Sequence, residues 1–265
     1  MKSNLRQRVA AEFLGTGFLV AAVVGSGITA ERLAGGNVAL ALLANTIATG
    51  AALVALILTF GSISGAHFNP VVSLSAAMRG GLAWADALPY SAAQVSGGVC
   101  GAVLSHLMFG LPLVSLSRHV RSGPAQFLSE IIATFGLLLV IWGCSRTRPN
   151  AVPFAVGSYI TAAHWFTAST SFANPAVTVA RSLSDTFAGI RPVDMPLFVL
   201  AQFMGGAAAT NLFRWLTNGN ENSAKEAPRL QEQMARRGNS ISGGVARAGL
   251  RIGMRACRHG PDGSF

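Results

Sequence analysis

The sequence predicts an all-α membrane protein, and two observations carry this prediction. Of its 265 residues, 51% are hydrophobic and only 11% are charged. In a soluble domain, about a quarter of the residues are charged. The few charges are also segregated, because 38–60 is a run of 23 residues without any charge and 195–213 is a run of 19. A helix of about 20 apolar residues crosses the ~30 Å hydrocarbon core of a bilayer. Several transmembrane helices are therefore expected.

Apolar runs of this length predict six transmembrane spans. Their expected bounds are about 9–30, 38–60, 88–111, 127–144, 153–170 and 195–216. The first span follows Lys2, Arg6 and Arg8, so a cleaved signal peptide is the alternative interpretation. The run of 22 residues is longer than the roughly 7–15 of a signal-peptide core and includes Glu12. We interpret it as a true span.

The net charge of +10 would also suit a nucleic-acid-binding protein, but the placement of the charges favours a membrane topology. If both termini are cytoplasmic, fifteen of the 20 Lys and Arg residues lie on the cytoplasmic side and five lie outside. This bias follows the positive-inside rule. We therefore predict a multi-pass protein of the cytoplasmic (inner) membrane, with both termini in the cytoplasm and no nucleic-acid partner.

The sequence contains a weak internal repeat. Residues 11–26 (AEFLGTGFLVAAVVGS) and 129–144 (SEIIATFGLLLVIWGC) share a Glu, a Thr and a late Gly at matching offsets. Each copy begins a half of the chain with three spans, so the second half enters the membrane with inverted topology. Inverted repeats place their functional site near the midplane of the bilayer.

The repeat defines the expected domain organisation. A channel domain, 9–217, comprises repeat one (9–111) and repeat two (125–217), and a short cytoplasmic N-terminus, 1–8, precedes it. The tail, 218–265, is rich in Gly, Ser, Arg and Asn and lacks long apolar runs. This composition favours a disordered cytoplasmic segment, and binding of its basic residues to anionic lipid is the alternative.

An Asn-Pro pair occurs once in each half, within HFNPVVS (67–73) and FANPAVT (172–178). Asn is a favoured N-cap and Pro is favoured at the first helical position, so each pair predicts a helix start rather than a helix break. About ten helical residues after a pair would give roughly 15 Å, half of a bilayer core. We expect two half-helices that meet tip to tip, with the backbone before each one lining a water-filled cavity. The alternative, a kinked span, is disfavoured because the pair recurs at equivalent places.

With these motifs the sequence resembles the aquaporin/major intrinsic protein family, over about residues 5–217. The resemblance rests on AEFLGT near the start, on SGAHFNPVVS and NPAVTVARS, and on the inverted repeat. It implies six tilted helices, two re-entrant half-helices, a pore in each protomer and a homotetramer. It also implies a passive channel that is not an enzyme and that needs no cofactor or metal.

The resemblance assigns roles to several residues. In the motifs Asn69-Pro70-Val71 and Asn174-Pro175-Ala176, the two Asn side chains would donate hydrogen bonds to passing solutes. Val71 stands where the family usually has Ala. Glu12 and Glu130 would support the re-entrant loops by accepting backbone N–H groups, and a proton relay through these carboxylates is the alternative. We expect His67 to line the cytoplasmic vestibule.

The selectivity filter of the family can be carried over by sequence offsets from the two asparagines. The positions obtained are Thr49, Ala162, Ser171 and Val177. The last position is usually an Arg in the family, and the others usually include aromatic side chains, with a His in water-selective members. Arg181 lies seven residues after Asn174 and is expected to point elsewhere. The sequence therefore predicts a wide, uncharged filter.

The expected function is that of an aquaglyceroporin-like bacterial channel. Glycerol-type polyols, urea, water, and neutral metalloid acids such as arsenite and methylated arsenicals would suit the wide filter. The alternative is an inverted-repeat secondary transporter coupled to protons through Glu12 and Glu130. A coupled transporter would need an ion site at the midplane, where this sequence has Asn and backbone groups.

Overall fold

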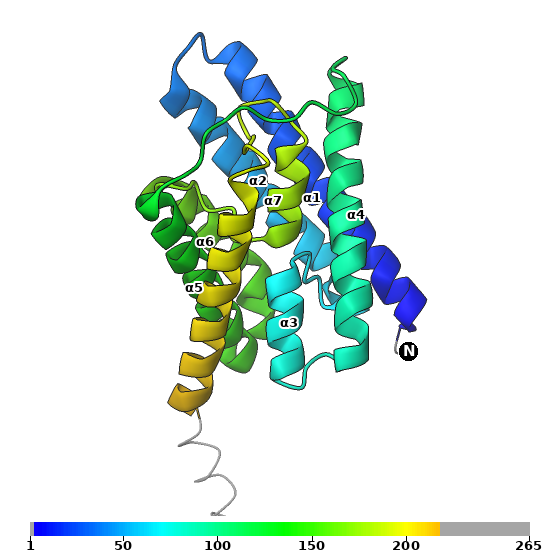
Figure 1. Cartoon of the computed structure of the whole chain (residues 1–265). Coiled ribbons are helices and arrows are strands. Elements are labelled where there is room, and N and C mark those ends of the chain that lie inside the picture. The colour runs from blue at the N-terminus through cyan, green and yellow to red at the C-terminus, as the bar shows by residue number, and fades with distance from the viewer. Residues whose placement is uncertain (1–2, 218–265) are drawn as a thin grey trace, which may run out of the picture. The chain divides into compact units, whose positions relative to one another are not determined.

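Residues 3–217 are described by a computed structural model, and all regular secondary structure within them is helical (Figure 1). The predicted tail, 218–265, lies outside the described residues. The helices are α1 (Leu5–Leu33), α2 (Val38–Ser64), α3 (Pro70–Met78), α4 (Trp84–Met108), α5 (Pro124–Thr147), the 3₁₀ helix η1 (Pro149–Ala151), α6 (Val152–Phe166), α7 (Pro175–Ser182) and a C-terminal helix, Met195–Thr217. Residues up to Phe213 belong to one compact unit.

Four helices within residues 3–217 are long and apolar enough to cross a membrane: α1, α2, α5 and the C-terminal helix. The other two predicted spans correspond to α4 and α6. Helix α4 has 25 residues but is less apolar, because it includes Asp86, Gln94 and several Ser and Gly residues. Helix α6 has only 15 residues, about 22 Å at 1.5 Å per residue. The chain is a multi-pass membrane protein, and its predicted all-α architecture with two half-helices is confirmed.

The fifth span was predicted too long. Helix α6 ends at Phe166 rather than continuing to residue 170, and the chain then runs without regular structure to Asn174. Thr170 and Ser171 lie in the left-handed region of backbone conformation, with φ of 57° and 48°, which a continuing right-handed helix excludes. Apolar composition alone carries no mark of this change, so the sequence prediction extended the helix into the segment.

Close helix packing in the first half depends on glycine. A Cβ atom at Gly101 would collide with the carbonyl oxygen of Gly17, and one at Gly97 would collide with that of Phe13. The backbones of α1 and α4 therefore touch along their contact. Gly205 of the C-terminal helix approaches the carbonyl of Ile131 in α5 in the same way. Small residues commonly permit this approach between membrane helices, and here the equivalent helix pair of each half uses it.

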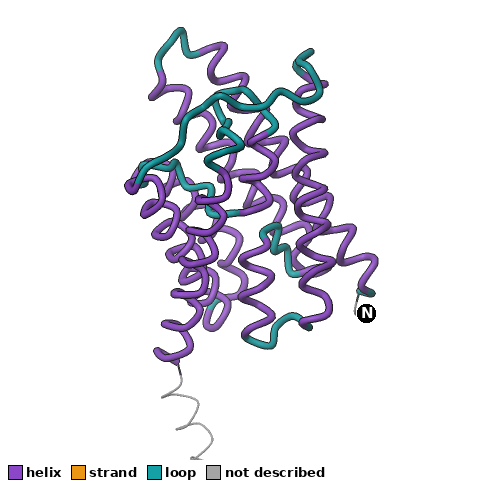
Figure 2. The backbone as a smooth tube through the Cα atoms, in the orientation of Figure 1, coloured by secondary structure: helices purple, strands orange, loops and turns teal. Residues whose placement is uncertain are grey.

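Two non-helical segments run into the interior of the helix bundle instead of over its ends (Figure 2). The first, 65–69, links α2 to α3, and the second, 167–174, links α6 to α7. Helices α3 and α7 are labelled one above the other in Figure 1, near the middle of the molecule. With nine and eight residues, they span about 14 and 12 Å. The bundle thus positions two short helix N-termini at its centre.

Candidate functional site

The two Asn-Pro pairs begin the half-helices as N-caps. Asn69 has extended backbone, and its side-chain oxygen accepts a hydrogen bond from the N–H of Val71 at 2.9 Å. Asn174 caps α7 in the same way, accepting from the N–H groups of Ala176 at 3.0 Å and Val177 at 3.4 Å. Each cap satisfies helix N–H groups that have no partner within the helix. The amide nitrogen of each Asn remains available as a donor.

Each amide nitrogen then reaches across to the other half. Asn69 donates from Nδ2 to the carbonyl oxygen of Ala173 at 2.7 Å, and Asn174 donates to that of Phe68 at 2.7 Å. An amide nitrogen carries two hydrogens, so one N–H of each Asn is left after this bond. Both residues line the main cavity of the protein. The arrangement fixes the two caps relative to each other and leaves one donor per Asn for a solute.

Glu12 of α1 holds the first re-entrant segment. Its Oε1 accepts from the N–H of His67 at 3.0 Å and the hydroxyl of Ser64 at 2.6 Å, and its Oε2 accepts from the N–H of Phe68 at 2.7 Å. Gln94 of α4 adds a fourth hydrogen bond at 2.7 Å and also donates to Ser73 of α3. Glu12 is completely buried. These bonds satisfy donors that would otherwise be stranded in the membrane interior.

Glu130 of α5 does the same in the second half. Its two oxygens accept from the N–H groups of Phe172 and Ala173, both at 2.9 Å. Gln202 of the C-terminal helix donates to Glu130 at 2.6 Å and to Thr178 of α7 at 2.9 Å. The two halves thus use matching sets of a carboxylate, a glutamine and a half-helix hydroxyl. Gln94 and Gln202 escaped the sequence analysis, although a polar side chain within an apolar span is itself a signal.

The re-entrant segments share a strained backbone pattern. Ala66 and Ser171 lie three residues before Asn69 and Asn174, respectively, and have φ of 50° and 48°. Phe68 and Ala173 lie directly before the two asparagines and have φ of 49° and 47°. Non-glycine residues rarely adopt such left-handed conformations, which persist where surrounding contacts enforce them and which concentrate at functional sites. The same strain at equivalent positions indicates that both segments are shaped for one purpose.

The main cavity has a volume of about 190 Å³ and two chemically different sides. Apolar side chains from α1, α2, α5 and α6 form one side, including Leu53, Leu137, Val156 and Ile160. The re-entrant segments and both Asn caps form the other. A channel wall of this kind can hold the carbon side of a polyol against apolar groups while its hydroxyls meet polar ones.

Three of the four predicted filter residues line this cavity: Thr49, Ser171 and Val177. The hydroxyls of Thr49 and Ser171 are buried and make no hydrogen bond within residues 3–217. Val177 lies one turn beyond Asn174 on α7. His67, the predicted vestibule residue, also lines the cavity, and its Nδ1 lies 3.1 Å from the Ser73 hydroxyl.

The prediction for Ala162 is wrong. Ala162 is exposed on α6 and forms no part of the cavity wall. The wall is formed by Val152, Val156, Ile160 and His164, which follow one another every four residues. A helix turns about 100° per residue, so a residue two positions from His164 faces nearly the opposite way. The offset from Asn174 failed because it ignored the helix face.

His164 therefore stands where Ala162 was expected. It is 4% exposed, and its Nδ1 lies 2.8 Å from the carbonyl oxygen of Ile160. A carbonyl can only accept, so Nδ1 carries a hydrogen, and the neutral ring offers Nε2 as an acceptor. His164 was not among the residues predicted from the sequence to line the channel. Its spacing from the apolar positions of the same helix face was the signal that could have identified it.

Arg181 was also predicted wrongly. It lines the main cavity, four residues after Val177 on the same face of α7. Its side chain is only 3% exposed, and its Nε donates to the carbonyl oxygen of Ala188. The guanidinium carbon lies 3.3 Å from the centre of the Phe172 ring. Among residues 3–217, Arg181 is thus the one Arg or Lys in the wall of this cavity, although the sequence prediction had Val177 at the usual position of the Arg.

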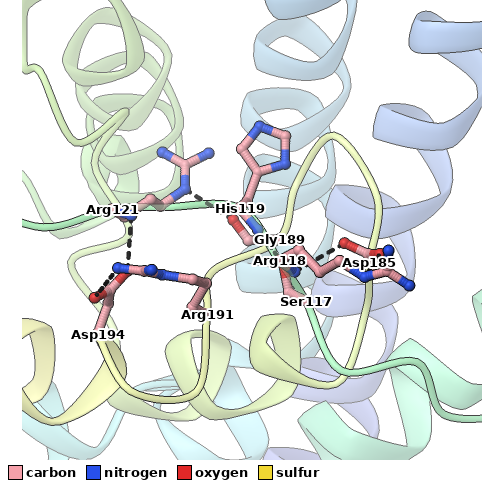
Figure 3. A network of polar contacts seen from close by, with 8 residues as sticks. All are labelled: Ser117, Arg118, His119, Arg121, Asp185, Gly189, Arg191 and Asp194. Carbon is pink, nitrogen blue, oxygen red and sulfur yellow. Dashed lines mark hydrogen bonds and ion pairs between the residues drawn. The ribbon is translucent and has the colours of Figure 1, made fainter.

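Loops at the end of the protein opposite the N-terminus are held together by polar contacts (Figures 1 and 3). Asp194 accepts two hydrogen bonds from Arg191, each at 3.0 Å, and one from the N–H of Arg121 at 2.9 Å. Burial alone would raise the pKa of Asp194, but these hydrogen bonds and the charge of Arg191 lower it below its usual value. Arg118 pairs with Asp185 at 3.5 Å.

Comparisons with known proteins agree with this geometry. The sequence profile of the family described as Major intrinsic protein matches residues 1–172. The chain is 57% identical over 213 residues to an aquaglyceroporin, AqpS, of Rhizobium meliloti (strain 1021), covering 80% of this chain and 91% of that protein. It is 30% identical to aquaporin Z of Bradyrhizobium diazoefficiens, over 80% of this chain and 93% of that protein.

A solved structure has the same fold. The X-ray structure of the aquaglyceroporin from Plasmodium falciparum matches with a TM-score of 0.61 at 23% identity, covering 79% of this chain and 96% of that one. An all-helical bundle with two half-helices capped by Asn, a cavity at their tips and these similarities lead to one assignment. The chain belongs to the major intrinsic protein family.

Proposed function

We propose that the protein is a passive membrane channel for small uncharged solutes, of the aquaglyceroporin type. The observation that carries this proposal is the cavity at the junction of α3 and α7, where Asn69 and Asn174 each keep one amide N–H without a partner in the part of the chain that the structure describes. A solute crossing this point exchanges hydrogen bonds with water for bonds with fixed donors. The opposing apolar wall accommodates its carbon atoms.

The chemistry of the outer half of the cavity supports conduction of solutes larger than water. Val177 offers an apolar side chain, Thr49 and Ser171 offer unpartnered hydroxyls, and His164 offers a ring nitrogen. Glycerol-type polyols fit such a lining, and so do neutral trihydroxy metalloid acids such as arsenous acid and neutral methylated arsenicals. The name of the relative from Rhizobium meliloti, an aquaglyceroporin, supports the same class of solute.

The alternative of a proton-coupled transporter has no support. Glu12 and Glu130 accept four and three hydrogen bonds, mostly from backbone or amide N–H groups, and both are fully buried. A carboxylate that already accepts several hydrogen bonds from a re-entrant segment is suited to holding that segment, because losing these bonds would strand N–H donors in the membrane interior.

We further propose that the protein is a homotetramer in the cytoplasmic membrane, with both termini in the cytoplasm. Large apolar side chains on α2 and α6 are exposed, among them Leu43, Ile47, Phe154 and Trp165. In a membrane such side chains contact lipid or further copies of the chain. Cross-linking of the protein in native membranes tests the tetramer, and cysteine labelling from each side tests the orientation.

The function is tested by swelling of proteoliposomes that contain the purified full-length chain. Glycerol and arsenous acid should enter these vesicles faster than protein-free vesicles, without saturation and without response to an imposed proton gradient. Vesicles carrying Asn174→Leu serve as the matched control. Flux that follows a proton gradient, or glycerol entry no faster than in protein-free vesicles, would contradict the proposal.

A further inference from the structure

A second cavity of about 210 Å³ lies beside the main one, and Arg181 lines both. Its other polar lining residues are Asn45, His119, Arg121, Gln126 and Thr170. Among residues 3–217, the side chains that line this cavity include two arginines and no carboxylate. We refer to this space as the side cavity.

Arg181 enters the side cavity as a buried cation. Its Nε donates to the carbonyl oxygen of Ala188, and its guanidinium stacks on the ring of Phe172. It forms no ion pair with a carboxylate among residues 3–217. Stacking on an aromatic ring and one carbonyl acceptor leave the two terminal nitrogens of the guanidinium without a carboxylate.

Arg121 lies beside the same ring. Its guanidinium carbon is 5.0 Å from the centre of Phe172, its Nε donates to the carbonyl of Gly189 at 2.8 Å, and its Nη1 donates to the carbonyl of Ser169 at 3.1 Å. Burial lowers the pKa of Arg121 to about 10, so it stays charged at neutral pH. Figure 3 shows Arg121 and His119 projecting to the same side of the loop, away from the pair formed by Arg191 and Asp194. Two cations therefore share one ring and one cavity.

The carboxylates around the side cavity are already engaged. Glu130 accepts three hydrogen bonds from the second re-entrant segment and Gln202. Asp194 is bound by Arg191, and Asp185 is bound by Arg118. Glu31, which is exposed, accepts from the N–H of Phe187 at 3.3 Å. Each of the surface acids is thus placed outside the cavity wall.

The local charge count gives a net value of +1. The count covers Arg121, Arg181 and Glu130, and both arginines interact electrostatically with Glu130. Glu31 is left out of it, because its carboxylate is exposed to water, although its charge also acts on His119. His119 adds no charge at neutral pH, because burial and repulsion from Arg121 lower its pKa below its usual value. A buried cation without a partner is costly in the membrane interior. A single negative charge would balance this count.

We propose that the side cavity binds a small oxygen-bearing monoanion, a carboxylate or a singly charged oxyanion, between Arg121 and Arg181. Guanidinium groups recognise such oxygens through planar, charge-assisted hydrogen bonds. The volume suffices for a small anion with accompanying water, since a water molecule takes up about 30 Å³ of liquid. Because Arg181 also lines the main cavity, the bound anion neutralises the charge at the outer end of the channel.

The test is anion binding by the purified full-length protein in detergent, which does not depend on which solute crosses the channel. Sodium acetate and, at about pH 6, sodium dihydrogen phosphate are titrated against sodium chloride at equal ionic strength. Calorimetry measures binding, and the thermal unfolding temperature provides a second readout, because a ligand that binds only the folded state stabilises it. The parent should show saturable binding and a rise in unfolding temperature with at least one of the two anions.

Two variants of Arg181 and one surface control separate binding at the site from the effect of general surface charge. Arg181→Gln should abolish saturable binding, and Arg181→Lys, which keeps the charge but lacks the planar fork, should weaken it at least threefold. Arg118→Gln removes one charge from the same loop, where the side chain is 91% exposed, and should bind as the parent does. If Arg181→Gln does not fold, the comparison of Arg181→Lys with Arg118→Gln decides. No saturable binding to the parent, or equal binding to the parent and to the Arg181 variant that folds, would overturn the proposal.

Discussion

Val177 and Arg181 lie four residues apart on α7 and both line the main cavity. The first lies one turn from the Asn174 cap, and the second lies near the end of the half-helix. The two residues therefore place an apolar side chain and a charged side chain at different points along the channel. We expect the Val177 side chain to set the width of the channel next to the cap, whereas the charge of Arg181, further from the cap, depends on whether an anion occupies the side cavity.

Val177→Arg should reduce glycerol flux about tenfold or more while water flux falls much less. The new side chain would fill the section next to the cap and place a second guanidinium one turn from Arg181. A barrier increase of about 1.4 kcal/mol corresponds to a tenfold change. Stopped-flow swelling of proteoliposomes measures both rates. Val177→Leu is the control, because it narrows the same section without adding charge and should reduce glycerol flux less. If Val177→Arg passes glycerol as fast as the parent, Val177 is not part of the filter.

Substitution by Trp distinguishes the two candidate filter positions on α6. His164→Trp places a large ring in the cavity wall and should block glycerol flux. Ala162→Trp lies on the exposed face of the same helix and should leave the flux within about twofold of the parent, as surface changes usually have small effects. Swelling rates, normalised to the amount of folded protein, give the comparison. The reverse ranking would restore Ala162 as the filter residue.

Asn174→Leu should abolish conduction in protein that still folds. The change removes the cap of α7 and the hydrogen bond to the Phe68 carbonyl. Loss of a cap costs about 0.5–2 kcal/mol, which leaves a folded fraction to assay by gel filtration. Asn69→Leu should behave alike, because Asn69 forms the equivalent bonds. Normal flux through either well-folded variant would show that the amides are dispensable.

Glu12→Gln should lower the stability of the folded protein more than Glu130→Gln. Each oxygen of Glu12 accepts two hydrogen bonds, whereas one oxygen of Glu130 accepts a single bond. An amide keeps only one accepting oxygen, so it strands two donors at Glu12 and one at Glu130. Each stranded donor costs about 1–3 kcal/mol. The thermal unfolding temperature in detergent should be highest for the parent, lower for Glu130→Gln and lowest for Glu12→Gln.

Glutamine variants also address proton coupling. If the carboxylates only hold the loops, then the flux per folded Glu130→Gln molecule should remain close to that of the parent. Complete loss of flux in a Glu130→Gln protein with normal gel filtration and an unchanged unfolding temperature would instead favour a proton-carrying role.

Asp194→Asn should lower stability near neutral pH and lose this effect in acid. The folded state lowers the pKa of Asp194, so the ion pair with Arg191 contributes stability above the unfolded pKa of about 3.9. That contribution disappears as the pH falls through the lower folded value. The difference in unfolding temperature between parent and variant should therefore shrink from pH 6 towards the acid limit. A difference that is constant with pH would show that the carboxylate charge is irrelevant there.

The sequence predicted the parts of the fold that local chemistry determines. Asn followed by Pro is both a cap and a helix start, so Asn69 and Asn174 marked two half-helices without any knowledge of tertiary contacts. The Glu positions followed from the repeat. Contacts between helices were harder to predict, because Gln94 and Gln202 reach the carboxylates of Glu12 and Glu130 only in the folded protein.

Errors in the filter arose from counting residues along the chain. The distance from Asn174 back to α6 crosses an irregular segment, and an error of two residues rotates the assignment to the opposite helix face, as happened with Ala162. For Arg181 the missing information was the path of residues 183–188, which returns the Ala188 carbonyl to its Nε. No periodic pattern in the sequence specifies that path.

The bonds of Gln94 have a consequence for biosynthesis. The first re-entrant segment is held by Glu12, which precedes it in the chain, and by Gln94, which follows it. Gln94 leaves the ribosome after α3, so the hydrogen bonds that Gln94 donates to Glu12 and to Ser73 are still missing when the first half-helix reaches the translocon. We expect α3 to remain outside the hydrocarbon core of the membrane until α4 has inserted. Cysteine labelling of nascent chains stalled before and after α4 has emerged would detect this delay as a change in accessibility at position 74.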